Sequence, residues 1–152
     1  MRVCLQRVKE AKVRILEENR EPREAGRIGT GVLALAGFAP DDGPETIAWM
    51  AAKIADLRIF EGTGKSGFHR SLRDEAGERL VVSQFTLYGD ARKGRRPDFG
   101  GAAPYARAET LYRDLLDCCE AELPGRVRAG EFGARMEVEL VNDGPVTLWI
   151  ER

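Results

Sequence analysis

The segment Ser83-Gln84-Phe85-Thr86 contains the residue types in this sequence that are best suited to chemistry. Two hydroxyls and a carboxamide follow the apolar run Leu80-Val81-Val82, so they are expected where a strand opens into a loop. Active sites are often built at such points, because loops placed by a rigid scaffold carry functional groups. From this segment alone the simpler role is favoured, in which Ser83 and Thr86 satisfy backbone groups at the strand terminus.

A second candidate is the segment Asn142-Asp143-Gly144-Pro145-Val146-Thr147. Asn, Asp, Gly and Pro are the residues expected in a tight turn, so the segment is predicted to link the last two strands of the chain. The Gly144-Pro145 bond could be cis, but most X-Pro bonds are trans and the local composition does not decide between the two.

A basic segment follows the first candidate. Four of five consecutive residues are cationic: Arg92, Lys93, Arg95 and Arg96. Aromatic residues flank the segment at Tyr88, Phe99 and Tyr105. Cations neutralise phosphates and rings stack on bases, which favours contact with a single-stranded or terminal part of tRNA. A solvated charged loop is the alternative, because the rest of the chain is balanced in charge.

Histidine and cysteine usage argues against metal chemistry. His69 is the single histidine and is expected in a Gly- and Arg-containing loop, so a Ser-His-Asp arrangement would have one candidate base. The three cysteines are Cys4, Cys118 and Cys119, which form neither a CxxC pair nor a disulfide framework. The two adjacent cysteines are expected to be core or half-buried residues of a helix, and no metal or cofactor is expected.

Length and charge limit the class of protein. The 152 residues suit one domain spanning 1–152, and 24 Lys and Arg against 25 Asp and Glu leave a net charge of −1. Any contact with RNA must therefore come from a local patch. The N-terminal residues alternate apolar and polar types and lack the apolar run of a signal peptide or membrane span. A cytoplasmic protein without a membrane partner is expected.

Hydrophobic patterning predicts the elements that must position these segments. Alternating or continuous apolar residues predict strands within 1–16 and at 31–38, 58–60, 80–85, 136–140 and 146–150. The run 31–38 is apolar throughout and is expected to be a central strand covered on both faces. A turn is expected at 17–24 and a Gly-rich polar loop at 61–78.

Apolar residues recur at spacings of three and four in two stretches. The first stretch begins at Pro44 and has Ile47, Met50, Ala51, Ile54 and Leu57 on one face. The second follows Pro104, has Ala108, Leu111, Tyr112, Leu115, Leu116 and Cys119 on one stripe, and ends at Pro124-Gly125. The expected fold is a single α+β domain with a mixed, largely antiparallel sheet and two main helices.

The segments taken together resemble the D-aminoacyl-tRNA deacylase family, also called the D-tyrosyl-tRNA(Tyr) deacylase family, over essentially the whole chain. The resemblance is carried by Gln6-Arg7-Val8, by Ser83-Gln84-Phe85-Thr86-Leu87 with 92–97 following it, and by 142–147. It favours the D-specific branch, because the related animal-type deacylase differs at Ser83 and Phe85. It also implies the D-aminoacyl-tRNA deacylase-like fold.

The resemblance implies a function and a site. The protein would hydrolyse the ester of D-aminoacyl-tRNA and glycyl-tRNA as a homodimer, with its active site at the subunit interface and the acceptor end of tRNA as its partner. Residues 83–86 would be catalytic, and Gly144, Pro145, Arg7 and Met136 would bind substrate. Gly144-Pro145 would be cis and braced by Arg7, and its carbonyl oxygens would exclude L-amino acids sterically from the other subunit's pocket.

The reaction needs a nucleophile and a means to stabilise the oxyanion. Backbone N–H groups of Phe85 and Thr86 are candidates for the second task. The nucleophile is either Thr86 itself or a water molecule assisted by the ribose 2′-hydroxyl, and the water is favoured because no base accompanies Thr86. Two other functions stay open: a non-catalytic tRNA-binding module using 92–96, and an esterase using Ser83 or Thr86 with His69.

Overall fold

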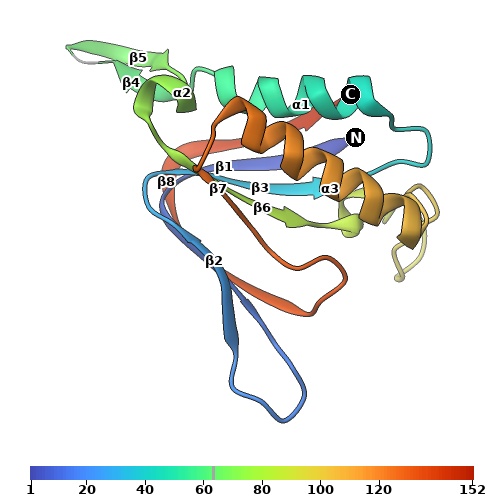
Figure 1. Cartoon of the computed structure of the whole chain (residues 1–152). Coiled ribbons are helices and arrows are strands. Elements are labelled where there is room, and N and C mark those ends of the chain that lie inside the picture. Colours follow the sequence, from blue (N-terminus) through green and yellow to red (C-terminus); the bar gives the residue numbers. More distant parts are fainter. Residues whose placement is uncertain (63) are drawn as a thin grey trace.

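The computed structural model describes all of the chain except residue 63, and the side chains of residues 65 and 66 also lie outside the described set. One six-stranded sheet forms the body of the molecule, and two helices lie on one of its faces (Figure 1). Its strands are β1 (Arg2–Ile15), β2 (Arg23–Ile28), β3 (Gly31–Gly37), β6 (Glu78–Ser83), β7 (Val127–Ala129) and β8 (Met136–Glu151). The predicted α+β class is confirmed.

The sheet is mixed and largely antiparallel, as predicted. Its order is β2-β1-β3-β6-β7, and β8 pairs along the other side of β1. The β1 pairs with β2, β3 and β8 are antiparallel, whereas the β3–β6 and β6–β7 pairs are parallel. The parallel pairs require crossover connections, and these are where the helices occur.

Strand β1 changes partner halfway along its length. Its first half, Arg2–Val8, pairs with β3, and its second half, Ala11–Ile15, pairs with β2. The sheet bends at this change, so that β2 lies against β6 and β7. A Cβ atom at Gly26 of β2 would stand 3.1 Å from the carbonyl oxygen of Ala129 in β7. The close approach explains why a glycine occupies this position.

The bend separates two hydrophobic cores. One lies between the sheet and the helices and includes Val3 and Leu5 of β1, and the other lies within the bend and includes Val8 and Val13. Strand β3 contributes alternate residues to both cores: Val32, Ala34 and Ala36 to the first, and Leu33 to the second. The prediction that this strand is covered on both faces is therefore confirmed.

Both predicted helices are present. Helix α1 spans Pro44–Asp56 with proline in its first turn, and helix α3 spans Tyr105–Glu122. The predicted stripes are buried, except that Leu57 is the C-terminal cap of α1 and Leu116 is half-buried. Cys119 is buried and Cys118 is half-buried, as expected. Among the helices of the described chain, none is long and apolar enough to cross a membrane.

The prediction of a loop at 61–78 was wrong, although residue 63 of that range lies outside the described residues. A hairpin of β4 (Phe60–Gly62) and β5 (Lys65–Arg70) and the short helix α2 (Leu72–Glu75) occupy it. His69 is therefore in a strand and not in a loop. A capping box between Ser71 and Asp74 starts α2, and the Ser-x-x-Asp spacing was the overlooked signal.

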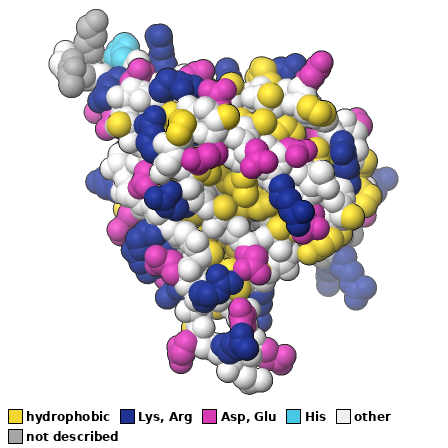
Figure 2. Space-filling model, viewed as in Figure 1, with side chains coloured by type: hydrophobic (Ala, Val, Ile, Leu, Met, Phe, Trp, Pro, Cys, Tyr) yellow, Lys and Arg dark blue, Asp and Glu magenta, His cyan; other side chains and the backbone are white. Residues whose placement is uncertain are grey.

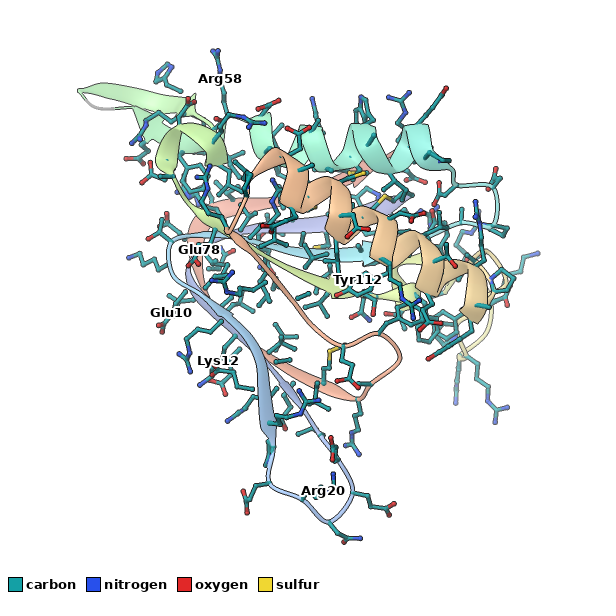
Figure 3. The ribbon with its side chains drawn as sticks, in the orientation of Figure 1. Glu10, Lys12, Arg20, Arg58, Glu78 and Tyr112 are labelled. Atoms are coloured by element: carbon teal, nitrogen blue, oxygen red, sulfur yellow. The ribbon has the colours of Figure 1, made fainter. Side chains whose placement is uncertain are left out.

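Other boundaries also differ from the prediction. Strand β2 begins at Arg23, within the expected turn at 17–24, and Arg20 lies at the tip of the β1–β2 connection (Figure 3). Of the strand predicted at 58–60, Phe60 alone is in a strand. The three-residue strand β7 was not predicted, because so short a segment carries no detectable alternation. The strand predicted at 80–85 ends at Ser83.

Residues 142–145 are not a turn between two strands. Strand β8 continues through them, and both of its halves pair with β1. Gln6 pairs with Thr147 and Val8 pairs with Asn142, so residues 143–146 of β8 stand opposite the single residue Arg7. We call these four residues the 143–146 bulge. The composition typical of a turn thus produces a bulge in a long strand.

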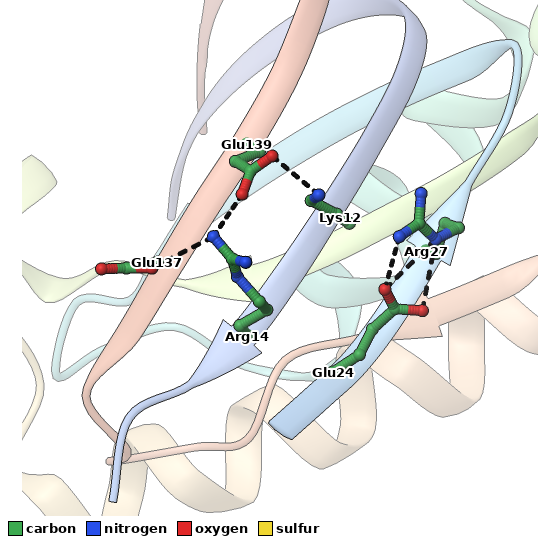
Figure 4. A network of polar contacts seen from close by, with 6 residues as sticks. All are labelled: Lys12, Arg14, Glu24, Arg27, Glu137 and Glu139. Atoms are coloured by element: carbon green, nitrogen blue, oxygen red, sulfur yellow. Dashed lines mark hydrogen bonds and ion pairs between the residues drawn. The ribbon is translucent and has the colours of Figure 1, made fainter. Parts of the chain in front are cut away.

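Surface ion pairs accompany the β1–β8 pairing. The glutamates that alternate along β8 face basic residues of β1: Glu139 contacts Lys12 and Arg14, and Glu137 contacts Arg14 (Figure 4). These groups are partly exposed, so each pair contributes only about 0–1 kcal/mol. Their alternation with apolar residues sets which face of β8 is turned inward.

Arg79 of β6 is a buried cation whose replacement tests the core. Its side chain is fully buried, Nη1 donates to the carbonyl oxygen of Ala51 at 3.3 Å, and no ion pair joins it to a carboxylate of the described residues. We expect Arg79→Met to leave the free energy of unfolding unchanged or raise it by up to about 4 kcal/mol, because desolvating an unpaired charge is costly. Urea denaturation measures this. Arg79→Ala, which also removes the packing of the stem, is the control and should destabilise; a loss with Met equal to that with Ala would contradict the prediction.

Candidate active site

A cavity of about 600 Å³ opens at the carboxyl end of β6. Ser83, Gln84 and Phe85 line one side of it, and Phe132 and Met136 line the other. We call it the β6 cavity. It lies beside the start of α3 and the connection from β7 to β8, and most of its remaining lining is apolar. Hydrophobic side chains gather at the centre of the face seen in Figure 2, between α3 and the β6–β7 region, with charged side chains around them.

The end of β6 is fixed by its neighbour β3. Ser83 is the last residue of β6 in register with β3, and the N–H of Gln84 still donates to the carbonyl oxygen of Ala36 at 2.7 Å. A Cβ atom at Gly37 would stand 2.8 Å from the Gln84 carbonyl oxygen, so only glycine permits this approach. The backbone then turns into the 3₁₀ helix η1 (Phe85–Tyr88).

Thr86 is joined to the cavity through Gln84. The Gln84 side-chain amide donates a hydrogen bond to the Thr86 hydroxyl oxygen. Among the described residues that line the cavity there is no carboxylate, imidazole or amine. A threonine hydroxyl needs such a base to become a nucleophile, so this surrounding suits a positioning role for Thr86.

Aromatic side chains build the opposite wall. Tyr105 and Phe132 meet edge to face with ring centroids 5.1 Å apart, and Tyr112 of α3 lies against Phe132. Figure 3 shows Tyr112 directed from α3 toward the sheet, where its hydroxyl donates to the Val81 carbonyl oxygen at 2.9 Å. Burial raises the pKa of Tyr112, so the hydroxyl stays protonated and keeps this bond at neutral pH.

The mouth of the cavity carries exposed rings. Phe85 is 58% exposed and packs against Phe99, with ring centroids 5.2 Å apart. Tyr88, at the end of η1, is half-buried and outside the lining of this cavity, with Arg2 over its ring at 4.3 Å. Burial raises the pKa of Tyr88 to about 12, so this phenol is neutral at physiological pH and does not act as a base. The mouth therefore offers aromatic faces rather than titrating groups.

The 143–146 bulge is attached to a buried arginine. Arg7 is 4% exposed, and its Nε donates to the Asp143 carbonyl oxygen at 3.2 Å and lies 2.8 Å from the Asp143 carboxylate. Its Nη2 donates to the Gly144 carbonyl oxygen at 3.4 Å, and its Nη1 donates to the carbonyl oxygen of Ile59. The Gly144-Pro145 peptide bond is cis. Arg7 thus connects the bulge with the residue before β4.

Side chains also close the neck of the bulge. The Gln6 amide donates to the Asn142 side-chain oxygen at 3.2 Å and to the Thr147 hydroxyl at 3.4 Å. Gln6, Asn142 and Thr147 therefore bridge the two strands where pairing is interrupted. No role was predicted from the sequence for these three residues, although the polar side chains of Asn142 and Thr147 on both sides of Gly144-Pro145 were a signal for one.

The structure brings some predicted site residues together and separates others. Ser83, Gln84, Phe85 and Met136 line one cavity. The described residues of that lining do not include Arg7, Gly144 or Pro145, which form a second feature of the chain. His69 is not in the lining either: its hairpin and the carboxyl end of β6 lie at opposite ends of the sheet in Figure 1.

The basic segment lies on a loop after η1. The N–H and carbonyl groups of Asp90 and Asp98 pair with each other and close the loop, with N–O distances of 2.7 and 2.9 Å. Arg92 makes an ion pair with Asp90 at 2.6 Å, and this hydrogen-bonded contact lowers the pKa of the Asp90 carboxyl. Among the described residues, no ion pair involves Lys93, Arg95 or Arg96, so three cations face solvent.

Sequence comparisons give the family. The sequence matches the profile of the family D-Tyr-tRNA(Tyr) deacylase over residues 4–151. Proteins named D-aminoacyl-tRNA deacylase from Thermosipho africanus (strain TCF52B) and Nitratidesulfovibrio vulgaris (strain DP4) are 48% and 49% identical to it; each match covers 99% of this chain, and 97% and 93% of those proteins. The chain belongs to the D-Tyr-tRNA(Tyr) deacylase family, as the resemblance predicted.

Solved structures agree with the fold. A structure titled c-Myc DNA Unwinding Element Binding Protein has a TM-score of 0.90 and is 36% identical, and the match covers 100% of this chain and 99% of that chain. A structure described as a probable eukaryotic D-amino acid tRNA deacylase has a TM-score of 0.80 at 19% identity, and covers 98% of this chain and 97% of that chain. The second likeness supports the fold alone.

Proposed function

We propose that this chain is a carboxylic ester hydrolase that removes D-amino acids, and glycine, from tRNA. The observation that carries the proposal is the β6 cavity, which Ser83, Gln84 and Phe85 line. The chain that forms it belongs to the D-Tyr-tRNA(Tyr) deacylase family. The cavity has the volume of a small-molecule site, and its apolar wall suits a base or an amino-acid side chain. With this activity the protein would serve quality control of translation, and we propose that it does so in the cytoplasm.

The chemistry relies on main-chain donors. The N–H groups of Phe85 and Thr86 stand at the first two positions of η1, where no helical carbonyl precedes them, and we assign them to the oxyanion of the tetrahedral intermediate. A water molecule attacks the ester carbonyl with help from the ribose 2′-hydroxyl. The bond between the acyl carbon and the 3′-oxygen then breaks, and the 3′-oxygen leaves as a hydroxyl with the proton that the water gives up. Thr86 orients the substrate. This assignment suits a cavity without a basic side chain.

The enantiomer filter is assigned to the bulge of a second copy of the chain. Within one chain, Pro145 is exposed and is not part of the lining of the β6 cavity, while an aromatic mouth stays open at Phe85. A homodimer that seats each bulge over the partner's cavity would complete both sites. Main-chain oxygens of Gly144-Pro145 would then occupy the place that an L side chain requires. Glycine has no side chain there and passes.

The acceptor end of tRNA is assigned to the aromatic mouth and the basic loop. Phe85 and Phe99 offer ring faces for bases, and Lys93, Arg95 and Arg96 offer positive charge for phosphates. A second candidate function is nucleic-acid binding without catalysis through this loop. The solved structure that is 36% identical to this chain belongs to a protein called c-Myc DNA Unwinding Element Binding Protein, and this likeness favours the second function.

A deacylation assay with matched substrates tests the proposal. We expect release of the amino acid from D-aminoacyl-tRNA and glycyl-tRNA, and release from the L-aminoacyl-tRNA only at the rate of the buffer control. Filter binding of the same tRNAs is measured in parallel. Binding without release from any of the three would support the non-catalytic module and reject the deacylase.

Substitution of Thr86 distinguishes between the two candidate nucleophiles, the Thr86 hydroxyl and a water molecule. Thr86→Ala is expected to keep measurable deacylation, because we assign Thr86 to orientation and not to covalent attack, whereas Thr86→Tyr should abolish it by filling the site. Single-turnover kinetics with D-aminoacyl-tRNA measure both variants, with tRNA binding as the control. An acyl-enzyme trapped on Thr86, or complete loss in Thr86→Ala with binding intact, would make Thr86 the nucleophile.

The cations of the basic loop are expected to differ in how much each contributes to tRNA affinity. Replacing Lys93, Arg95 and Arg96 by Gln should weaken binding and reduce the slope of log affinity against log salt by about 0.7 for each lost phosphate contact. Arg92→Gln is the matched control, because Arg92 is already paired with Asp90 and should matter less. Fluorescence anisotropy over a salt series measures the slopes. Unchanged slopes in the triple variant would mean that the loop is only a solvated charged segment.

A further inference from the structure

Phe68 of the β4–β5 hairpin is an exposed aromatic residue in contact with the buried arginine of the bulge. The Arg7 guanidinium carbon lies 5.5 Å from the centre of the Phe68 ring and 5.9 Å from the centre of the Phe60 ring. Phe60 is buried in the core, but Phe68 remains 46% exposed. The core does not require Phe68 for its packing, so its contact with Arg7 needs another explanation.

The geometry points to Phe68 as a positioning residue for the enantiomer filter, acting through Arg7. An aromatic face attracts a guanidinium at these distances and limits how its plane turns. The Nε and Nη2 groups of that plane donate to the Asp143 and Gly144 carbonyl oxygens. Turning the guanidinium plane would move or break both hydrogen bonds. By holding this plane, the Phe68 ring would therefore help to fix the main chain of the 143–146 bulge. This inference rests on the role proposed for Gly144-Pro145.

The hairpin that carries Phe68 is anchored independently of the bulge. Arg70, at the end of β5, makes an ion pair with Glu75 at 2.7 Å, and its Nη2 donates to the Asp74 carbonyl oxygen of α2 at 2.6 Å. The N–H of Ile59 donates to the Arg70 carbonyl oxygen at 3.1 Å, while the carbonyl oxygen of Ile59 accepts from Arg7. Arg7 therefore contacts the Phe60 and Phe68 rings of the hairpin and the Ile59 carbonyl oxygen just before it, so the hairpin links the position of α2 to that of the bulge.

Substitution of Phe68 tests the inference. Phe68→Leu keeps an apolar side chain but removes the ring, and should lower the ratio of kcat/KM for D- over L-aminoacyl-tRNA about two- to fivefold, as expected for one partly exposed cation–π contact. KM for the D-substrate should stay unchanged, because Phe68 does not line the β6 cavity. Phe68→Trp, which restores a ring, should keep the wild-type ratio.

A matched control exists on helix α1. Trp49 has the Arg152 guanidinium 4.8 Å from the centre of its ring, and this contact is remote from the bulge. Trp49→Leu removes an aromatic contact of the same kind and should leave the D-over-L ratio unchanged. A fall in the ratio in Trp49→Leu as large as in Phe68→Leu would show that the effect is a general loss of stability, and would overturn the inference.

A spectroscopic measurement does not depend on activity. The Nε–Hε signal of Arg7 in a nitrogen–proton spectrum reports its ring contact and hydrogen bond, and should shift in Phe68→Leu but not in Trp49→Leu. The role of Phe68 would be overturned if Phe68→Leu changed neither the Arg7 signal nor the D-over-L ratio. If Arg7→Lys still lowered the ratio in that case, the proposed filter would remain supported. A ratio unaffected by Arg7→Lys would instead reject the filter itself.

Discussion

Burying the Arg7 guanidinium is the constraint on which the arrangement of this chain depends. A cation removed from water must be matched by oxygen atoms, or the cost of desolvation is several kcal/mol. The chain supplies these oxygens from the main chain of Ile59, Asp143 and Gly144 and from the Asp143 carboxylate. Three segments that are distant in sequence are thereby fixed at one point: the middle of β1, the root of the hairpin and the bulge of β8.

This burial is possible because β1 passes from one hydrophobic core to the other along its length. Val3 and Leu5 face the helices, whereas Val8 faces the core within the bend, so Arg7 is the last residue of β1 on the helix side before the sheet turns. At that point β8 leaves its pairing with β1 for residues 143–146 and resumes it on both sides. The carbonyl groups freed from the ladder are the acceptors that a buried guanidinium requires. The bulge therefore supplies the acceptors that Arg7 needs, and Arg7 satisfies the carbonyl groups that the bulge leaves unpaired.

Local patterns predicted the parts of the fold that local physics determines. Helix α1 follows from Pro44 and its apolar stripe, and β3 follows from an unbroken apolar run, so both could be read from the sequence. The continuity of β8 could not be predicted, because Asn142 to Pro145 has the composition of a turn and only pairing with β1 identifies it as a bulge. The β4–β5 hairpin was missed for the same reason, since its residues show no regular alternation and its contacts with Arg7 and α2 are not visible in the sequence.

The candidate site shows the same division. Ser83-Gln84-Phe85 could be placed at a strand end because apolar residues precede it, and a cavity does open there. Besides the Asp143 carboxylate, the partners of Arg7 are three main-chain oxygens, which leave no mark in a sequence. The contact with Phe68 joins residues sixty-one positions apart. Among the described residues, no carboxylate, imidazole or amine lines the cavity, so charge that develops there must be stabilised by neutral donors such as backbone N–H groups, which act best where the backbone is fixed. The end of β6 is fixed against Gly37 and the bulge is fixed against Arg7, so the proposed function would draw on main-chain groups that are held rigidly at two places in the chain.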